Sequence, residues 1–151
     1  MNLKEFIIKA KKDTYASGKK SHKLPNGSER FTFEEGDWKY QDTYFAFDNE
    51  FKGTFFGTEI AWSKGRMCWN MNYYGQVNSP EIGTPQIYAF LRKAMSAVSK
   101  DRPFRGPATL KENDFEYRDE SEGDLNQFRG TERILHKGKE VYRLEYHGGK
   151  I

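Results

Sequence analysis

Hydrophobic residues recur at helical spacing in two places, at the start of the sequence and just past its middle. The first stripe consists of Leu3, Phe6, Ile7 and Ala10. Asn2 is placed to cap this helix, and Thr84 followed by Pro85 predicts a capped first turn for the second. The second stripe consists of Ile87, Phe90, Leu91, Ala94, Met95 and Val98. Each stripe is about one helix face wide, so both helices are predicted to pack on a core.

Alternation of apolar and polar residues predicts strands after each helix, most clearly in the stretch RMCWNMNYYG at residues 66–75. Lys64-Gly65 and Lys137-Gly138 are predicted to form two-residue hairpin turns. In the first hairpin this register predicts a core face of Phe56, Thr58, Ile60, Trp62, Met67, Trp69, Met71 and Tyr73. It places on the opposite face Phe55, Gly57, Glu59, Ala61, Cys68, Asn70, Asn72 and Tyr74.

The two hairpins are similar to each other in sequence. Residues 57–75 align without a gap on residues 130–148, and seven of nineteen positions are identical. The similarity continues upstream after a four-residue shift, with residues 33–42 over residues 110–119. Such self-similarity indicates an internal duplication. It places Glu59 and Glu132 at equivalent positions.

These patterns predict an α+β fold and a single domain, residues 1–151, built of two repeats at about 2–75 and 85–148. Each repeat is a helix followed by an antiparallel meander, which is the element order of a cystatin-like roll. A turn-rich linker at 75–83 joins the repeats. We expect pseudo-twofold symmetry, with both helices on one face of the sheet.

Composition narrows the class of protein. The single cysteine, Cys68, excludes an internal disulfide and favours a reducing compartment. No signal peptide or membrane-spanning run is recognisable, so we expect a soluble, cytoplasmic protein without membrane contact. Residues 1–24 hold seven lysines against Glu5 and Asp13, a net +5, which leaves −2 for the rest of a chain of net charge +3. The sequence leaves the oligomeric state open.

Several side chains are candidates for ligand contact. Core packing does not explain the polar and aromatic face that carries Glu59, Asn70, Asn72 and Tyr74. An aromatic groove between the repeats would draw on Trp38, Tyr40 and Tyr44. The predicted cross-strand pairs are Glu59 with Asn70 and Glu132 with Arg143. His147 aligns with Tyr74 and completes the set of candidates. The favoured interpretation is a non-catalytic, sensor-type module that binds a small molecule or a partner in a cleft where the repeats meet.

The sequence leaves two alternatives open. Convergence of Glu59 and Glu132 would suit an acid–base hydrolase or isomerase. The lysine-rich segment 9–23 would suit weak binding of single-stranded nucleic acid. The favoured interpretation of this segment, however, is a solvent-exposed helix face followed by a lysine-rich loop. No spacing typical of a metal site, phosphate loop or nucleophile elbow occurs, so no metal or other cofactor is assigned.

Five short motifs carry a resemblance to a known family. They are Gly36–Asp42, Trp69–Gly75, Phe104–Pro107, Phe128–Glu132 and Tyr146–Gly149. With these motifs the chain resembles, over nearly its whole length, a bacterial family of small domains of unknown function. Some members of that family carry the domain behind a helix-turn-helix. The resemblance implies no activity, cofactor or catalytic residue, and it makes a sensor or ligand-binding role more plausible than an enzyme.

Overall fold

The structure is a computed structural model that describes all residues, 1–151. It contains the helices α1 (Leu3–Asp13) and α2 (Thr84–Ser96) and the short 3-10 helix η1 (Tyr15–Ser17). The strands of the first half are β1 (His22–Lys23), β2 (Glu29–Glu35), β3 (Trp38–Asp48), β4 (Lys52–Ser63) and β5 (Arg66–Asn78). Those of the second half are β6 (Thr109–Glu112), β7 (Phe115–Asp124), β8 (Gln127–His136) and β9 (Lys139–Lys150).

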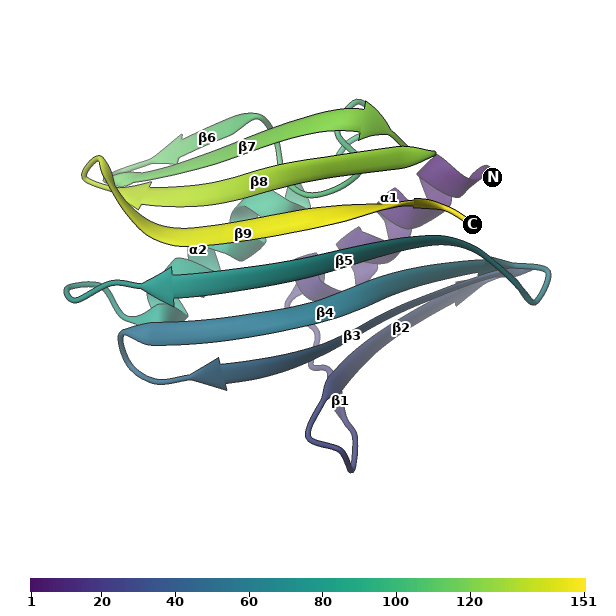
Figure 1. The fold of residues 1–151 in the computed structure, drawn as a ribbon, viewed down its shortest axis with the longest axis horizontal. Helices are drawn as coiled ribbons and strands as arrows, with labels where there is room; N and C mark the ends of the chain where they lie inside the picture. Colours follow the sequence, from purple (N-terminus) through teal and green to yellow (C-terminus); the bar gives the residue numbers. More distant parts are fainter.

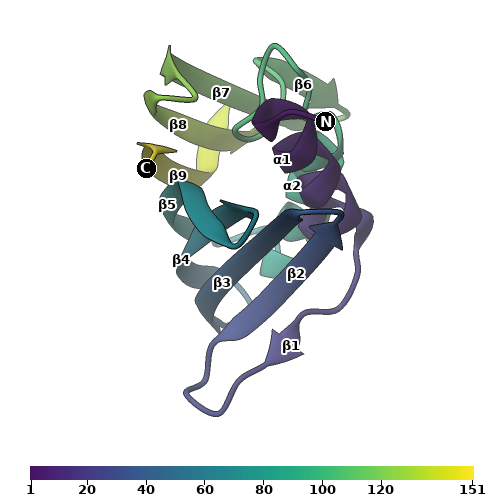
Figure 2. The ribbon, with the colours of Figure 1, turned by 90° about the vertical axis from the view of Figure 1, so that its right-hand side faces the viewer.

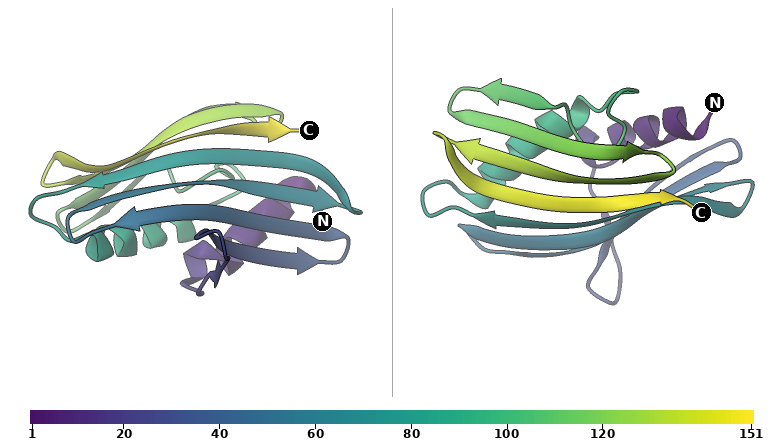
Figure 3. Two further views of the ribbon diagram at one scale, coloured as in Figure 1. Left: turned by 60° about the horizontal axis from the view of Figure 1, so that its bottom comes forward. Right: turned by 45° about the horizontal axis from the view of Figure 1, so that its top comes forward.

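All nine strands form one antiparallel sheet in the order β1-β2-β3-β4-β5-β9-β8-β7-β6 (Figure 1). Strands β5 and β9, each the last of its half, pair with one another at the middle of the sheet. The sheet curves around α1 and α2, which both lie on its concave side (Figure 2). Two further views show the same arrangement and the long, bent central strands (Figure 3). The α+β class and the placement of both helices on one sheet face are therefore confirmed.

The start of α1 is formed as predicted. The side chain of Asn2 accepts a hydrogen bond from the backbone N–H of Glu5, and Glu5 returns one to the Asn2 backbone, which makes a capping box. The cap of α2 is Gly83 instead of the predicted Thr84, so Thr84 and Pro85 begin the helix proper. The hydroxyl of Thr84 instead donates to the carbonyl of Asn49, 2.9 Å away. Neither helix is long and apolar enough to span a membrane.

The core fills the space between the helices and the concave face of the sheet. A single cluster of 22 buried residues joins side chains of both helices to strands of both halves. Trp69 is fully buried at its centre and stacks on Phe128, with ring centroids 5.7 Å apart. Because one cluster spans both halves, neither half has a core of its own.

The first hairpin departs from the predicted register at one residue. Trp62 pairs with Met67 across the two-residue turn, as predicted, but Ala61 then pairs with Trp69. Cys68 is therefore the extra residue of a β-bulge, which shifts all later pairs by one. Since neighbouring residues in a strand point to opposite faces, this shift inverts the predicted faces of β4.

The inversion corrects several predictions. Glu59 and Ala61 are buried on the concave face, whereas the predicted core residues Phe56 and Met67 are 38% and 44% exposed. Thr58, Ile60 and Trp62 also lie on the outer, convex face. The prediction that Trp69, Met71 and Tyr73 belong to the core is confirmed.

The predicted cross-strand partners of both glutamates are wrong for the same reason. Glu59 pairs with Met71, and Asn70 pairs with Ile60. In the second hairpin the register shifts between Ile134 and Leu135. Glu132 consequently pairs with Leu144, not with Arg143.

A glycine in each half lets a tyrosine cross the strand beside it. A Cβ atom at Gly130 would overlap the ring and hydroxyl of Tyr146, and one at Gly57 would lie 2.6 Å from the hydroxyl of Tyr73. The close approach allows the Tyr146 hydroxyl to reach both carboxylate oxygens of Asp119, at 3.0 and 3.1 Å.

We therefore expect Gly130→Ala to lower the free energy of unfolding by about 1–3 kcal/mol, because the added methyl group overpacks the site. Urea denaturation measures the change. Thr131→Ala, at the next position but on the outer face, should cost less than about 1 kcal/mol. Equal losses in the two variants would contradict the close packing of Tyr146 on Gly130.

Candidate functional site

The interior of the fold contains a cavity of about 190 Å³ between the concave face of β3–β5 and the helices. Its walls come from both halves of the chain, with Tyr40 and Tyr73 from the sheet and Met95 from α2. Tyr44 and Tyr88 are half-buried nearer the opening, where Ala46 and Asp48 at the end of β3 are exposed. The cavity therefore runs from an exposed mouth to a buried floor.

Charged side chains form that floor. Asp42 and Glu59 are directly paired residues of β3 and β4, so their carboxylates are neighbours on the concave face. Lys11 of α1 donates to Glu59 at 2.5 Å, and Tyr73 donates to Asp42 at 2.6 Å. Arg105 lies over the Tyr73 ring, 5.8 Å from its centroid.

Burial perturbs the ionisation of these groups. It raises the pKa of Asp42 to about 7, with a further contribution from the neighbouring negative charge of Glu59, while Tyr73 and Lys11 act in the opposite direction. The same loss of solvent lowers the pKa of Lys11, although Glu59 favours its charged form. Burial and the nearby carboxylates raise the pKa of Tyr73 well above its ordinary value. Perturbed groups that line a cavity are typical of functional sites.

A second buried carboxylate pair lies in the other half of the chain. Asp119 and Glu132 are directly paired on β7 and β8, as Asp42 and Glu59 are on β3 and β4. Arg105 donates two hydrogen bonds to Glu132, at 2.8 and 3.1 Å. Tyr117 and Tyr142 donate to the same carboxylate at 2.5 and 2.6 Å. Glu132 is fully buried and its oxygens are fully occupied, so it anchors Arg105 structurally.

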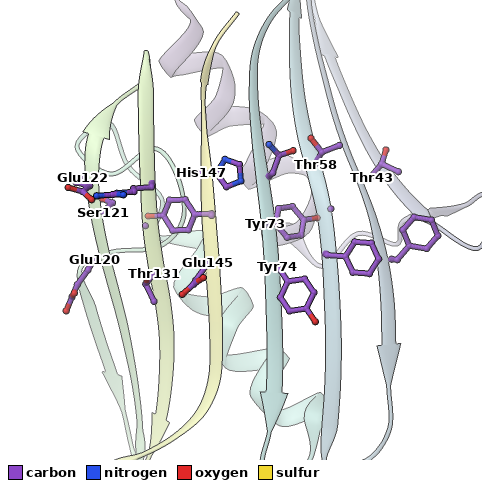
Figure 4. Close-up of a pocket in the computed structure, with 17 residues that line it drawn as sticks. Thr43, Thr58, Tyr73, Tyr74, Glu120, Ser121, Glu122, Thr131, Glu145 and His147 are labelled. Carbon is purple, nitrogen blue, oxygen red and sulfur yellow. The ribbon is translucent and has the colours of Figure 1, made fainter.

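The outer face of the sheet has a separate, shallow groove of about 1280 Å³. It crosses the junction between β5 and β9, with the helices on the far side of the sheet (Figure 4). Thr58, Asn72 and Tyr74 line its first half, and His147 and Glu145 line its second.

The predicted site residues divide between these two places. Glu59, Tyr40 and Tyr44 line the interior cavity. Asn72, Tyr74 and His147 line the outer groove. The prediction that Glu59 shares a face with Asn70, Asn72 and Tyr74 is therefore wrong, because the bulge at Cys68 turns Glu59 inward.

The remaining candidates line neither place, although Asn70 is next to the groove. Asn70 donates to Asn72 at 3.2 Å on the outer face. Trp38 stacks on Phe6 of α1, with centroids 5.3 Å apart. Arg143 pairs loosely with Glu140 and Glu145 in solvent, each at 3.6 Å. Glu132 belongs to the anchored cluster, which is the buried group of Arg105, Tyr117, Glu132 and Tyr142.

Three residues of the cavity floor were not singled out from the sequence. They are Lys11, Asp42 and Arg105. Asp42 had a usable signal, because it aligns with an identical Asp119 and each lies two residues after a tyrosine. Lys11 and Arg105 had none, since a helix lysine and a loop arginine are normally exposed.

The lysine-rich start of the chain is partly neutralised. Lys9 pairs with Glu35 at 2.5 Å, Lys19 pairs with Asp13 at 2.6 Å, and Lys11 is buried against Glu59. This pairing weakens the case for nucleic-acid binding through residues 9–23, which stays an untested prediction.

The fold and cavity thus define an α+β domain in which a curved antiparallel sheet and two helices enclose a charged, aromatic-lined chamber. The chain belongs to a family described as a domain of unknown function (DUF5680), whose sequence model matches residues 42–151. The match begins at Asp42 and includes Glu59, Arg105 and the anchored cluster. No curated protein and no solved structure matches the chain significantly.

Proposed function

We propose that this protein is a non-catalytic binding module that holds a small organic amine in the interior cavity. The observation that carries the proposal is Asp42, a buried carboxylate in an aromatic-lined chamber without a cationic partner of its own. A binding pocket typically combines such walls with one or two convergent polar groups.

The distribution of charge favours a cationic ligand. Among the buried charges of the floor, Lys11 is paired with Glu59 and Arg105 with Glu132. Asp42 accepts only the neutral Tyr73 hydroxyl among the hydrogen bonds of the structure. An ammonium group placed beside Asp42 would therefore complete the set of pairs and hold Asp42 ionised.

The walls suit the rest of such a ligand. Tyr40, Tyr73 and Phe55 line the same cavity as the carboxylate, and aromatic faces attract cations by their quadrupoles. The volume of about 190 Å³ is below the roughly 300–1,000 Å³ typical of sites for drug-sized molecules. We infer a metabolite-sized amine with a short apolar or aromatic body.

An acid–base enzyme is a weaker proposal. Glu132 has four donors on its two oxygens, so neither of them is free for a substrate proton, and Lys11 occupies Oε2 of Glu59. The acid nearest to Glu59 is Asp42, its cross-strand neighbour. The geometry therefore favours binding over the predicted Glu59/Glu132 chemistry.

Isothermal titration calorimetry at pH 8 with phenethylamine and tyramine tests the proposal, with 2-phenylethanol as the uncharged analogue. We expect both amines to bind and the alcohol to bind at least tenfold more weakly, since a charge-assisted hydrogen bond contributes about 1.5–3 kcal/mol. Asp42→Asn should weaken amine binding at least tenfold.

The matched control is Asp119→Asn, because Asp119 also accepts a tyrosine hydroxyl on the concave face but does not line the cavity. It should leave amine affinity within twofold. Absence of amine binding, or an equal loss in both aspartate variants, would contradict the proposal.

We further propose that the two halves arose by duplication. They would be related by a pseudo-twofold axis at the seam, which is the junction between β5 and β9. The aligned residues Tyr73 and Tyr146 pair directly across β5 and β9. The aligned turn residues Lys64 and Lys137 share a φ of 50°. The two register shifts also fall at aligned positions, Ala61/Trp62 and Ile134/Leu135. These coincidences support common ancestry of the halves.

A sensor-type role in the bacterial cytoplasm is part of the same proposal. Its support is the single cysteine and the resemblance to domains found behind a helix-turn-helix. In that role the amine would be a signal, and its capture by Asp42 would be the event that is sensed.

A further inference from the structure

The outer face of β3, β4 and β5 has a central area without charge, bounded by Lys39 in the row before it and by Lys52 in the row after it. Cross-strand pairing places twelve outward side chains there in four rows of three. The rows are Gln41–Ile60–Asn70, Thr43–Thr58–Asn72, Phe45–Phe56–Tyr74 and Phe47–Thr54–Gln76. In a chain with 31% charged residues, a solvent-facing surface of this size without a single charge requires an explanation.

The neighbouring strands show that the sheet does not avoid charge in general. The last three of these four rows continue across β9, β8 and β7, where most of the residues are charged. They are His147, Glu145, Arg143, Arg129, Thr131, Arg133, Glu122, Glu120 and Arg118. Most of these form surface ion pairs, such as Arg133 with Glu120 at 3.2 Å. Charge is therefore absent from these four rows but borders them on every side, including β2, where Arg30 donates to the hydroxyl of Thr43 at 3.1 Å.

One of the four uncharged rows is aromatic. Phe45, Phe56 and Tyr74 stack in sequence across the three strands, with centroids 5.5 and 6.1 Å apart. Phe47 extends the stack at 6.4 Å from Phe56. Phe47 is 64% exposed and Tyr74 is 52% exposed. An exposed aromatic platform of this kind marks an interaction site.

The platform borders the outer groove, and the adjoining row supplies hydrogen-bonding groups to it. Phe45, Phe56 and Tyr74 form one row of its lining, and Thr43, Thr58 and Asn72 form the adjoining row. Figure 4 shows Tyr74, Thr58 and Thr43 on this side of the groove. Hydroxyl and amide groups can both donate and accept hydrogen bonds. A ligand in the groove would therefore meet stacked rings and neutral donors and acceptors on the β3–β5 side, and Glu120, Glu122, Arg129 and Glu145 on the β7–β9 side.

We infer that this groove binds a neutral oligosaccharide chain. A sugar ring has a flat C–H face that stacks on aromatic rings and a rim of hydroxyls that pair with amide and hydroxyl side chains. The groove is lined by three glutamates, Glu120, Glu122 and Glu145, and by a single arginine, Arg129. This excess of negative charge disfavours phosphate-bearing partners, which depend on Lys and Arg. The concavity disfavours a second copy of the same face, which would leave the groove unfilled. The site lies on the opposite face of the sheet from the amine cavity, so the two proposals are independent.

Affinity electrophoresis in native gels tests the inference, with glycogen, laminarin or galactomannan cast in the gel. We expect at least one of these neutral polysaccharides to retard the protein, and polygalacturonate to have no such effect. Phe56→Ala and Tyr74→Ala should each weaken the retardation at least tenfold in polysaccharide concentration. Thermal unfolding of both variants would show that the fold is retained.

Two variants serve as matched controls, and both should bind like the original chain. Arg143→Ala alters an exposed outer-face residue of β9 beyond the platform, and Asp42→Asn alters the interior cavity. Retardation by none of the three neutral polysaccharides would overturn the inference, as would equal retardation of the aromatic variants. Salt-sensitive binding of poly(dT) by the same face would also overturn it. The inference would also be overturned if light scattering showed a dimer that Phe56→Ala converts to a monomer.

Discussion

Replacing Glu132 with alanine is expected to lower the free energy of unfolding by about 3–5 kcal/mol, the usual effect of removing one member of a buried ion pair. The loss is large because Arg105 is 5% exposed and would keep a buried charge without its partner. The hydroxyls of Tyr117 and Tyr142 would lose their acceptor as well. A domain is stable by only about 5–15 kcal/mol, so urea denaturation should detect a major shift of the midpoint.

A surface glutamate provides the control for this experiment. Glu122→Ala removes the partner of Arg129 on the exposed end of β7, where both side chains are solvated. Its effect should stay within about 1 kcal/mol. Glu132→Gln should fall between the two, because the amide oxygen still accepts a hydrogen bond but leaves Arg105 uncompensated. If Glu132→Ala costs no more than Glu122→Ala, the cluster does not hold the fold together as described.

The second large effect concerns Asp42 and the pH dependence of stability. The pKa of Asp42 is about 7 in the folded chain, against an ordinary value of 3.8. Between about pH 4 and 7 the folded chain keeps a proton that the unfolded chain releases. The stability contributed by this protonation is therefore present at low pH and lost as pH rises, by about 1.4 kcal/mol per pH unit for one group.

Asp42→Asn should remove this dependence, because an amide does not titrate. We expect the variant to gain stability over the original chain progressively from pH 4 to 7 and to keep a constant advantage above pH 7. Urea midpoints across pH 4–8 give the comparison. Asp119→Asn, where the pKa is about 6, should show a smaller gain over a narrower range. Parallel curves for the Asp42 variant and the original chain would refute the raised pKa.

Stability and binding should thus oppose each other at residue 42. An asparagine is expected to make the empty domain more stable near neutral pH while removing its affinity for amines. Retention of an ionisable, buried residue at a cost in stability is common at functional sites. A stabilised variant that still bound phenethylamine normally would separate the two effects.

Much of the fold follows from the sequence because its signals are periodic. The helix stripes at residues 3–10 and 87–95 could be found by spacing, although the predicted Val98 lies beyond the end of α2. The turn residues Lys64-Gly65 identify one hairpin tip. The core position of Trp69 was also predictable, since it lies in a regular alternation. These features depend on residues close together in the chain.

The failures share a physical cause, which is that a bulge leaves no clear mark in the sequence. A single unpaired residue at Cys68 reverses the faces of β4 and moves Glu59 from solvent into the core. Phe56 and Met67 then occupy the outer face, although their hydrophobicity predicted a place in the core. Burial of Lys11 was equally hidden, because it requires a carboxylate that is distant in sequence.

The seam between β5 and β9 also has a consequence for how the molecule assembles. Strand β9 is the last in chain order and yet lies at the middle of the sheet, where it joins residues near 70–77 to residues near 142–149. Until it is in place, β5 and β8 each present a row of unpaired backbone groups, which are natural sites of intermolecular pairing. Pairing of β9 with β5 joins residues far apart in the sequence, so this step should be slow and rate-limiting for folding. Interruption of this step would be the main route to aggregation.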